Sequence, residues 1–237
     1  MINYICNRLK KNKITEINSS YTINNIYVDK ISKYLYFNTS LKTLSLNCIE
    51  IKNIDKLAES LKYNSSLEKL DLSFNKIKNI DNLAENLKFN SSLKELYLCN
   101  NKIENIDKLF ECLKCNSSLT ELILWDNKIE NIDKLSESLK YNTTLKILDL
   151  RNNKIKNIYK LSESLKYNSS LTELYLSGNK IENIDELNES LKYNSTLKKL
   201  DLSYNKIKEE DIIKLNKNNK NIRIIFKKDD FFFPYFH

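Results

Sequence analysis

The sequence predicts an α/β solenoid, a right-handed horseshoe with a parallel β-sheet on its concave face and helices on its convex face. The first observation is that a variant of L-x-x-L-x-L-x-x-N recurs at a fixed period, which indicates one small unit stacked on copies of itself. The second is that each unit carries a strand pattern followed by a helix pattern, so consecutive strands must run parallel. Because strands lie ~4.8 Å apart and packed helices about 8 to 10 Å apart, the stack must curve with its sheet inside. The seven segments open at Leu41, Leu67, Leu93, Leu119, Leu145, Leu171 and Leu197, each twenty-six positions after the one before.

The pattern divides the chain into three parts. Residues 1–40 are expected to form a degenerate N-terminal cap, because residues 28–40 match only the helix half of the unit and terminal units must cover the end of the core. Residues 41–222 hold the seven repeats of this period. Residues 223–237 are expected to contain a C-terminal edge strand, which begins near Ile222, and an aromatic tail.

The strand of each repeat is read from an alternation of apolar and polar residues. In the unit at residues 67–92, Leu70 and Leu72 alternate with Lys69 and Asp71. Side chains along a strand point to opposite faces in turn, so one face is buried and the other is exposed.

The helix of each repeat is read from the spacing of Ile80, Leu83 and Leu87, which lie on one stripe of a helix. Asn79 is expected to cap its N-terminus and Asn90 to end it in a left-handed conformation. With a single glycine in the chain, asparagine is expected to fill the left-handed turn positions in general.

One asparagine follows the strand in six of the seven repeats and is expected to be structural. A buried amide there can bond backbone groups of neighbouring turns, and its loss should cost about 1 to 3 kcal/mol. This predicted asparagine ladder is Asn75, Asn101, Asn127, Asn153, Asn179 and Asn205. The alternative is glycosylation of exposed asparagines, for which the Asn-Ser-Ser sequons at Asn64, Asn90, Asn116 and Asn168 would matter only in a secreted protein.

The string LAESLKYNSSLEKLDLSFNKI at residues 57–77 resembles the ribonuclease-inhibitor-type class of leucine-rich repeats, here with a unit shortened to twenty-six positions. The resemblance covers about three quarters of the chain, and its motif is specific because leucine, asparagine and helix positions all agree at one spacing. That class also occurs in NOD-like receptors and in the activator of the Ran GTPase. The resemblance therefore implies a protein-interaction module, or less directly a regulator of a small GTPase.

Catalytic chemistry has few residues to use. The only histidine is the last residue, His237, and Gly178 is the only glycine, which argues against a histidine triad, a histidine zinc site and a glycine-rich phosphate loop. Cys112 and Cys115 have the spacing of a metal half-site, but no second ligand pair exists and both occupy ordinary repeat positions. We therefore expect no enzyme activity, no cofactor and no metal.

Composition also bears on location. No run approaches the ~18 to 20 apolar residues that span a bilayer, and the first residues lack the apolar core of a signal peptide. Five cysteines are an odd number and do not recur from repeat to repeat, so reduced thiols are the simpler interpretation. The expectation is an intracellular, monomeric protein.

Partner specificity is expected where the repeats differ, on the exposed strand positions. Trp125 lies at the centre of this face, and tryptophan, tyrosine and arginine are enriched in binding hot spots. The candidate partner-binding residues are Tyr97, Ile123, Trp125, Ile147, Asp149, Arg151 and Tyr175. The leading hypothesis is that these residues bind an unidentified protein or peptide. The alternative is that they are scattered apolar surface residues with no role in binding.

The net charge of +8 raises nucleic acid as an alternative partner. The exposed strand positions carry six acidic and three basic residues, however, and a phosphate-binding face would be basic. The excess lysines fall on the helices and turns, so the alternative is nucleic-acid binding through lysine columns of the convex side.

The aromatic tail, residues 231–237, has three possible roles. Its five aromatic residues could fold back over the last repeat, remain a frayed end, or serve as a short docking motif.

Overall fold

The structure, a computed structural model, describes residues 2–18 and 25–227, and the aromatic tail lies outside these residues. The helices are α1 (Ile2–Lys10), η1 (Asn25–Tyr27, a 3-10 helix), α2 (Val28–Leu35), α3 (Asp55–Leu61), α4 (Asp81–Leu87), α5 (Asp107–Leu113), α6 (Asp133–Leu139), α7 (Tyr159–Leu165), α8 (Asp185–Leu191) and α9 (Glu209–Asn218). The strands are β1 (Glu16–Asn18), β2 (Thr43–Ser45), β3 (Lys69–Asp71), β4 (Glu95–Tyr97), β5 (Glu121–Ile123), β6 (Ile147–Asp149), β7 (Glu173–Tyr175), β8 (Lys199–Asp201) and β9 (Arg223–Ile225).

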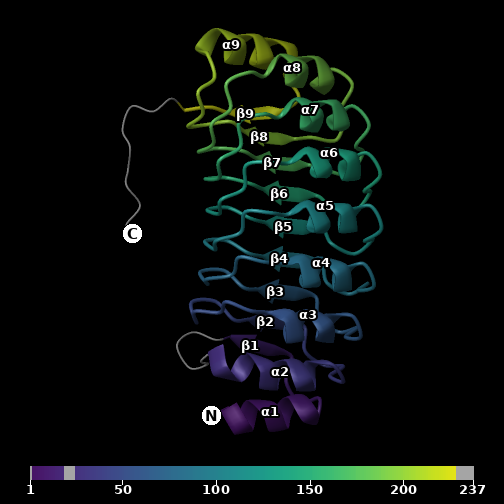
Figure 1. The fold of residues 1–237 in the computed structure, drawn as a ribbon. Helices are drawn as coiled ribbons and strands as arrows, with labels where there is room; N and C mark the ends of the chain where they lie inside the picture. Colours follow the sequence, from purple (N-terminus) through teal and green to yellow (C-terminus); the bar gives the residue numbers. More distant parts are fainter. Residues whose placement is uncertain (1, 19–24, 228–237) are drawn as a thin grey trace.

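The predicted fold class is confirmed. The strands form one parallel sheet in chain order from β1 to β9, and helices alternate with them along the other side of the stack (Figure 1). From β2 to β7 each strand pairs with the strand one sequence period later, as in Thr43 with Lys69 and Leu44 with Leu70. The sequence period therefore corresponds to one step of the solenoid.

The two ends extend this stack. Residues 1–40 contain α1, β1 and α2, and β1 pairs with β2 through Ile17 and Leu44. At the other end β9 pairs with β8 through Leu200 and Ile224. The longer helix α9 covers part of the final unit and buries Ile212 and Leu215.

The core is one continuous apolar column. The leucines of the strand and the isoleucines and leucines of the turn and helix are buried in the repeats, as Leu70, Leu72, Ile77, Ile80 and Leu83 are, with the exception of Ile213 in α9. Burial of each large side chain contributes roughly 1.5 to 3 kcal/mol before conformational entropy is subtracted.

The asparagine after each strand from β3 to β8 makes hydrogen bonds across repeats. The Asn75 side-chain amide donates to the carbonyls of Leu46 and Leu72, both at 2.9 Å, and its oxygen accepts from the Ile51 amide at 2.9 Å. Asn101, Asn127, Asn153, Asn179 and Asn205 donate to the equivalent carbonyls. We call this column the first ladder.

A second ladder of asparagines lies between each helix and the next strand. The Asn90 side chain donates to the Leu61 carbonyl at 2.7 Å and accepts from the Leu93 amide at 2.8 Å. The expectation of a left-handed C-terminal cap at Asn90 is wrong: the C-cap is Lys88, with a right-handed φ of −57°, and Asn90 instead ties two repeats together. The second ladder is Asn38, Asn64, Asn90, Asn116, Asn142, Asn168 and Asn194. Its members at the four Asn-Ser-Ser sequons are buried, which hides these amides from glycosylation.

Two other local expectations need correction. Helix α4 begins at Asp81, so the N-cap residue is Ile80 and not Asn79. The Asn79 side chain nevertheless caps the helix, because its oxygen accepts a hydrogen bond from the Asp81 amide at 2.7 Å. Asparagine does not fill all the left-handed positions. The column just before the first ladder is left-handed and holds Cys48, Phe74, Asn100, Asp126, Asn152, Gly178 and Tyr204.

Candidate protein-binding surface

The exposed strand positions form continuous rows on the concave face. In each strand from β2 to β8 the central leucine is buried, and the residues on both sides of it point outward and are mostly half-buried. The strand register places Tyr97 beside Ile123, Ile123 beside Asp149, and Asp149 beside Tyr175. These side chains, far apart in sequence, therefore form one row across four strands.

Six of the seven predicted residues are half-buried on this face: Tyr97, Ile123, Trp125, Ile147, Arg151 and Tyr175. Asp149 is the exception, since it is only 2 % exposed. A buried carboxylate needs a partner of opposite charge. Asp149 therefore serves to hold a neighbour and has little surface left to offer a ligand.

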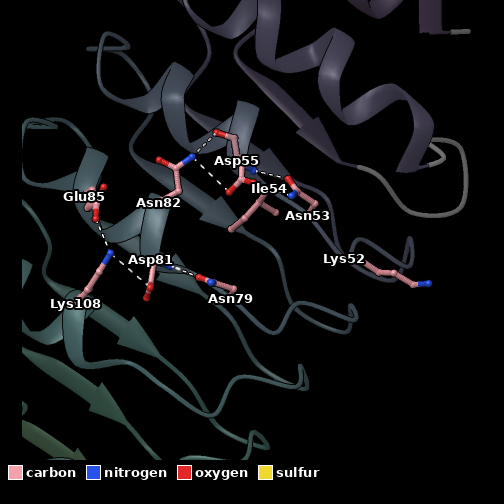
Figure 2. A pocket seen from close by; sticks show the side chains of 9 residues that line it. All are labelled: Lys52, Asn53, Ile54, Asp55, Asn79, Asp81, Asn82, Glu85 and Lys108. Atoms are coloured by element: carbon pink, nitrogen blue, oxygen red, sulfur yellow. Dashed lines mark hydrogen bonds and ion pairs between the residues drawn. The ribbon is translucent and has the colours of Figure 1, made fainter.

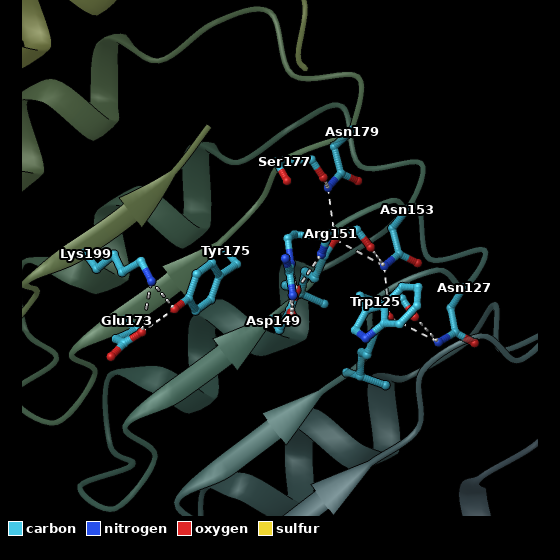
Figure 3. A network of polar contacts seen from close by, with 12 residues as sticks. Trp125, Asn127, Asp149, Arg151, Asn153, Glu173, Tyr175, Ser177, Asn179 and Lys199 are labelled. Carbon is cyan, nitrogen blue, oxygen red and sulfur yellow. Dashed lines mark hydrogen bonds and ion pairs between the residues drawn. The ribbon is translucent and has the colours of Figure 1, made fainter. Parts of the chain in front are cut away.

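That neighbour is Arg151. Its Nε atom donates to the two carboxylate oxygens of Asp149 at 2.9 and 3.0 Å, and its backbone amide donates to the same group at 3.0 Å (Figure 3). The hydrogen bond to Asp149 raises the pKa of Arg151. The guanidinium carbon lies 5.2 Å from the centre of the Tyr175 ring, a cation–π distance. Arg151 is thus fixed in one orientation on the surface.

Tyr175 is held from its other side. Lys199 donates to its hydroxyl at 2.7 Å and lies 4.7 Å from its ring centre, and the hydroxyl itself donates to Glu173. Burial and then the Glu173 carboxylate raise the pKa of Tyr175. The tyrosine is therefore a fixed, neutral side chain at physiological pH.

A matching cluster surrounds Tyr97. Its hydroxyl lies 3.0 Å from carboxylate oxygens of both Glu95 and Glu121, while Lys69 lies 4.4 Å from its ring centre and 2.9 Å from Glu95. Burial and these carboxylates raise the pKa of Tyr97 well above its ordinary value. Two tyrosine clusters, each with a glutamate and a lysine at the ring, thus flank the centre of the face.

The centre is an aromatic pair that sequence reasoning missed. Trp125 contacts Phe74, two repeats earlier, with ring centres 5.7 Å apart and planes at 77°. Phe74 has a φ of 56° and is 46 % exposed. A bulky residue in the left-handed region is strained, and an exposed phenylalanine gains little from burial. The signal in the sequence is that Phe74 stands where Asn100, Asn152 and Gly178 stand in other repeats.

A separate pocket lies beside the starts of α3, α4 and α5 (Figure 2). Its polar groups bind one another: Lys108 lies 2.6 Å from Glu85 and 3.6 Å from Asp81, and Asn82 bonds Asp55. Among the described residues, no three histidine, cysteine, aspartate or glutamate side chains gather as a metal site would require. No helix in the described ranges is long and apolar enough to cross a membrane.

All five cysteines are free. Cys112 is buried in α5 and Cys115 is exposed after it, so the two thiols of the candidate half-site differ in their access to solvent.

The chain matches models of leucine-rich repeats over most of its repeat region. Models described as leucine rich repeat match residues 40–58, 117–181 and 193–215, and one described as leucine rich repeats in two copies matches residues 65–111. These general models do not distinguish the ribonuclease-inhibitor-type class, which stays a prediction. No curated protein matches the sequence.

Two similar solved structures are internalins of Listeria monocytogenes. The chain is 23% identical to inlF with a TM-score of 0.63, and the match covers 97% of this chain and 64% of that chain. It is 23% identical to inlC2 with a TM-score of 0.55, and that match covers 95% of this chain and 96% of the other. At this identity the likeness concerns the fold.

Proposed function

The chain is a leucine-rich-repeat protein, and from that premise we propose that it is a non-catalytic interaction module whose concave face binds a protein or a peptide. The observation that carries the proposal is the aromatic pair of Trp125 and Phe74, set between two ordered tyrosine clusters. Large solvent-accessible rings that the scaffold does not need are typical of binding hot spots.

The order of the surrounding side chains supports this function. Arg151 is held by Asp149, and Tyr97 and Tyr175 by their lysine and glutamate neighbours. Side chains that are already fixed lose less conformational entropy when a partner binds. A preorganised face of tyrosine, arginine and tryptophan is therefore suited to specific binding.

The charge of the face indicates the kind of partner. Glu121 accepts from the Tyr97 hydroxyl, and within the described part of the chain it has no cation within 4 Å. It lies beside Ile123 and Ile147. A segment that presents an apolar side chain next to a lysine or arginine complements this arrangement.

The proposal also covers location and assembly, with an intracellular monomer as its simplest form. Cys48 and Cys115 are exposed free thiols, which persist most readily in a reducing compartment. Light scattering of the purified chain under reducing conditions tests the monomer.

The test is affinity capture from cell extracts followed by mass spectrometry. The bait is compared with a Trp125→Ala and Tyr97→Ala double variant, and with Tyr159→Ala as a control, because Tyr159 is 53 % exposed on helix α7. We expect a protein captured by the wild type and the control and lost with the double variant. Equal recovery with all three baits would mean that the concave patch is not the binding site.

A further inference from the structure

A row of exposed aromatic side chains runs along one rim of the solenoid, between the helices and the strands that follow them. One ring stands directly before the second-ladder asparagine in six of seven units. The rings are Phe37, Tyr63, Phe89, Tyr141, Tyr167 and Tyr193, each 54–76 % exposed, with Cys115 in the seventh place. Burial does not explain them, and they lie away from the concave patch.

A lysine precedes the ring position in each unit from Tyr63 onward, including the unit in which Cys115 takes the place of the ring. Lys62 lies 5.5 Å from the centre of the Tyr63 ring and 4.9 Å from that of Phe89 in the next repeat. Lys140 likewise lies 5.7 Å from the Tyr167 ring in the next repeat. Lysines and rings therefore interleave from repeat to repeat. The lysines are Lys62, Lys88, Lys114, Lys140, Lys166 and Lys192.

The net positive charge of the chain is concentrated on this rim. The seven helix-to-strand loops (residues 36–42, 62–68, 88–94, 114–120, 140–146, 166–172 and 192–198), which we call the basic rim, hold ten lysines and one glutamate. Their net charge is +9, compared with +8 for the whole chain. The seven strand-to-helix segments on the other side (residues 48–55, 74–81, 100–107, 126–133, 152–159, 178–185 and 204–211), the opposite rim, have a net charge of −3.

The scaffold does not account for the combination. A lysine at the end of a helix is favoured by the helix dipole, but the dipole does not explain an exposed aromatic ring beside the lysine. The second ladder fixes the backbone behind each ring, as Asn64 does through the carbonyls of Leu35 and Asn38. The rings are thus held in a regular row by a rigid support.

We propose that the basic rim binds single-stranded nucleic acid, with its rings stacked on bases and its lysines against phosphates. A site that recurs with little change from unit to unit fits a ligand made of similar units. The exposed hydroxyl residues two places after the rings, such as Ser65 and Thr143, add donors of the kind that contact phosphate oxygens. Stacking platforms beside a line of positive charge are the usual means of binding single strands without reading their sequence.

An anionic membrane surface is the competing occupant. Lysines would favour it, but insertion into the lipid interface relies on leucine, tryptophan or phenylalanine, and four of the six rings here are tyrosines. Apart from Tyr36 beside Phe37, the exposed neighbours of the rings are lysines and hydroxyl residues. The composition of the rim therefore favours the nucleic acid.

The test is fluorescence anisotropy of labelled 20-residue oligo(dT) and oligo(U) with the full chain, between 50 and 200 mM salt. We expect saturable binding that weakens steeply with salt. Replacing Lys62, Lys88 and Lys140 by glutamine should lower the slope of log affinity against log salt by about 2, since each phosphate contact to a single strand contributes ~0.7. The matched control replaces Lys102, Lys128 and Lys180 of the opposite rim by glutamine and should leave affinity within about twofold.

A second variant separates stacking from charge. Replacing Tyr141, Tyr167 and Tyr193 by serine should weaken binding by about a hundredfold or more with an unchanged salt slope. Circular dichroism and thermal melting check that each variant is folded. The proposal is overturned if neither oligonucleotide binds at 50 mM salt, if the opposite-rim control loses as much affinity as the basic-rim variant, or if the serine variant binds as the wild type does. Binding to phosphatidylserine vesicles in place of oligonucleotides would assign the rim to membranes and equally overturn it.

Discussion

The asparagine ladders and the concave face are made from neighbouring positions of the same repeat, yet the ladder residues are repeated from unit to unit and the concave residues vary. The first ladder holds asparagine in every repeat from the second to the seventh, and the second ladder holds it at every helix-to-strand loop from Asn38 to Asn194, because each amide bonds backbone groups of two repeats at once. On the concave face the residue changes from one repeat to the next, and Trp125 has no counterpart in the chain. The comparison teaches that repetition here marks the groups that hold the fold, whereas variation marks the groups free to recognise a partner.

The largest expected effect concerns the ladders. Asn116 is buried, donates to the carbonyls of Leu87 and Asn90, and accepts from the amide of Leu119 at 2.8 Å. Asn116→Ala should lower the free energy of unfolding by about 3 kcal/mol, because several buried backbone groups lose their partners together. Urea unfolding followed by circular dichroism measures it.

Asn105→Ala is the matched control. Asn105 is exposed and makes a single hydrogen bond of this kind, from the Asp107 amide at 2.9 Å, at the start of a helix. Its loss should cost only about 1 kcal/mol. If the two substitutions lowered the free energy of unfolding equally, the ladder asparagine would contribute no more to stability than a surface asparagine, contrary to the prediction.

Trp125→Ala should have a small effect on stability and a large effect on partner binding, the reverse of a ladder substitution. Its stability cost should be about 1 kcal/mol, since the side chain is half-buried and its ring pairs with Phe74. Affinity for a captured partner should fall by about thirtyfold or more, as expected for a hot spot. Calorimetric titration and urea unfolding of the same sample compare the two effects. A large loss of stability with unchanged affinity would place Trp125 with the scaffold.

Phe74→Gly tests whether Phe74 contributes more to partner binding than to stability. Glycine relieves a left-handed conformation that costs a non-glycine residue about 1 to 2 kcal/mol, while the lost contact with Trp125 is worth about 0.5 to 1.5 kcal/mol. Stability should therefore change by less than about 1 kcal/mol, and partner affinity should fall. A clear gain in stability with full affinity would indicate that the strain at Phe74 serves no binding role.

The smallest effect concerns thiol reactivity and leaves the fold intact. Burial raises the pKa of Cys99 to about 11 and that of Cys112 to about 12, so both remain neutral thiols at pH 8. Cys48 and Cys115 are exposed. A thiol-reactive dye at pH 8 should label two cysteines quickly in the native protein and all five in urea. Rapid native labelling of Cys112 would contradict the buried position of its helix face.

The sequence predicts the repeated parts of this molecule well, because every repeat shows the same residue pattern and so supports the same local structure. The strands, helices and sheet order follow from leucine and isoleucine spacing alone. The second ladder is harder to recognise, because Asn90 also suits a helix end and only the position of the neighbouring repeat reveals its partner carbonyls.

Contacts between non-equivalent positions are harder to predict. Phe74 reaches Trp125 from a turn position two repeats away, and no periodic pattern specifies such a contact. Asp149 is expected on the surface by its place in the strand, yet it is buried with Arg151 as its partner. Such pairings depend on side-chain directions that the repeat spacing does not contain.

Trp125 also supplies the most direct test, because it is the only tryptophan of the chain and lies at the centre of the proposed binding face. The measurement is its fluorescence during titration with a captured partner that lacks tryptophan, together with quenching by acrylamide. The account predicts a blue shift of the emission and reduced quenching that saturate at the stoichiometry of binding. Binding at full affinity with unchanged emission and quenching would contradict the assignment of the concave face.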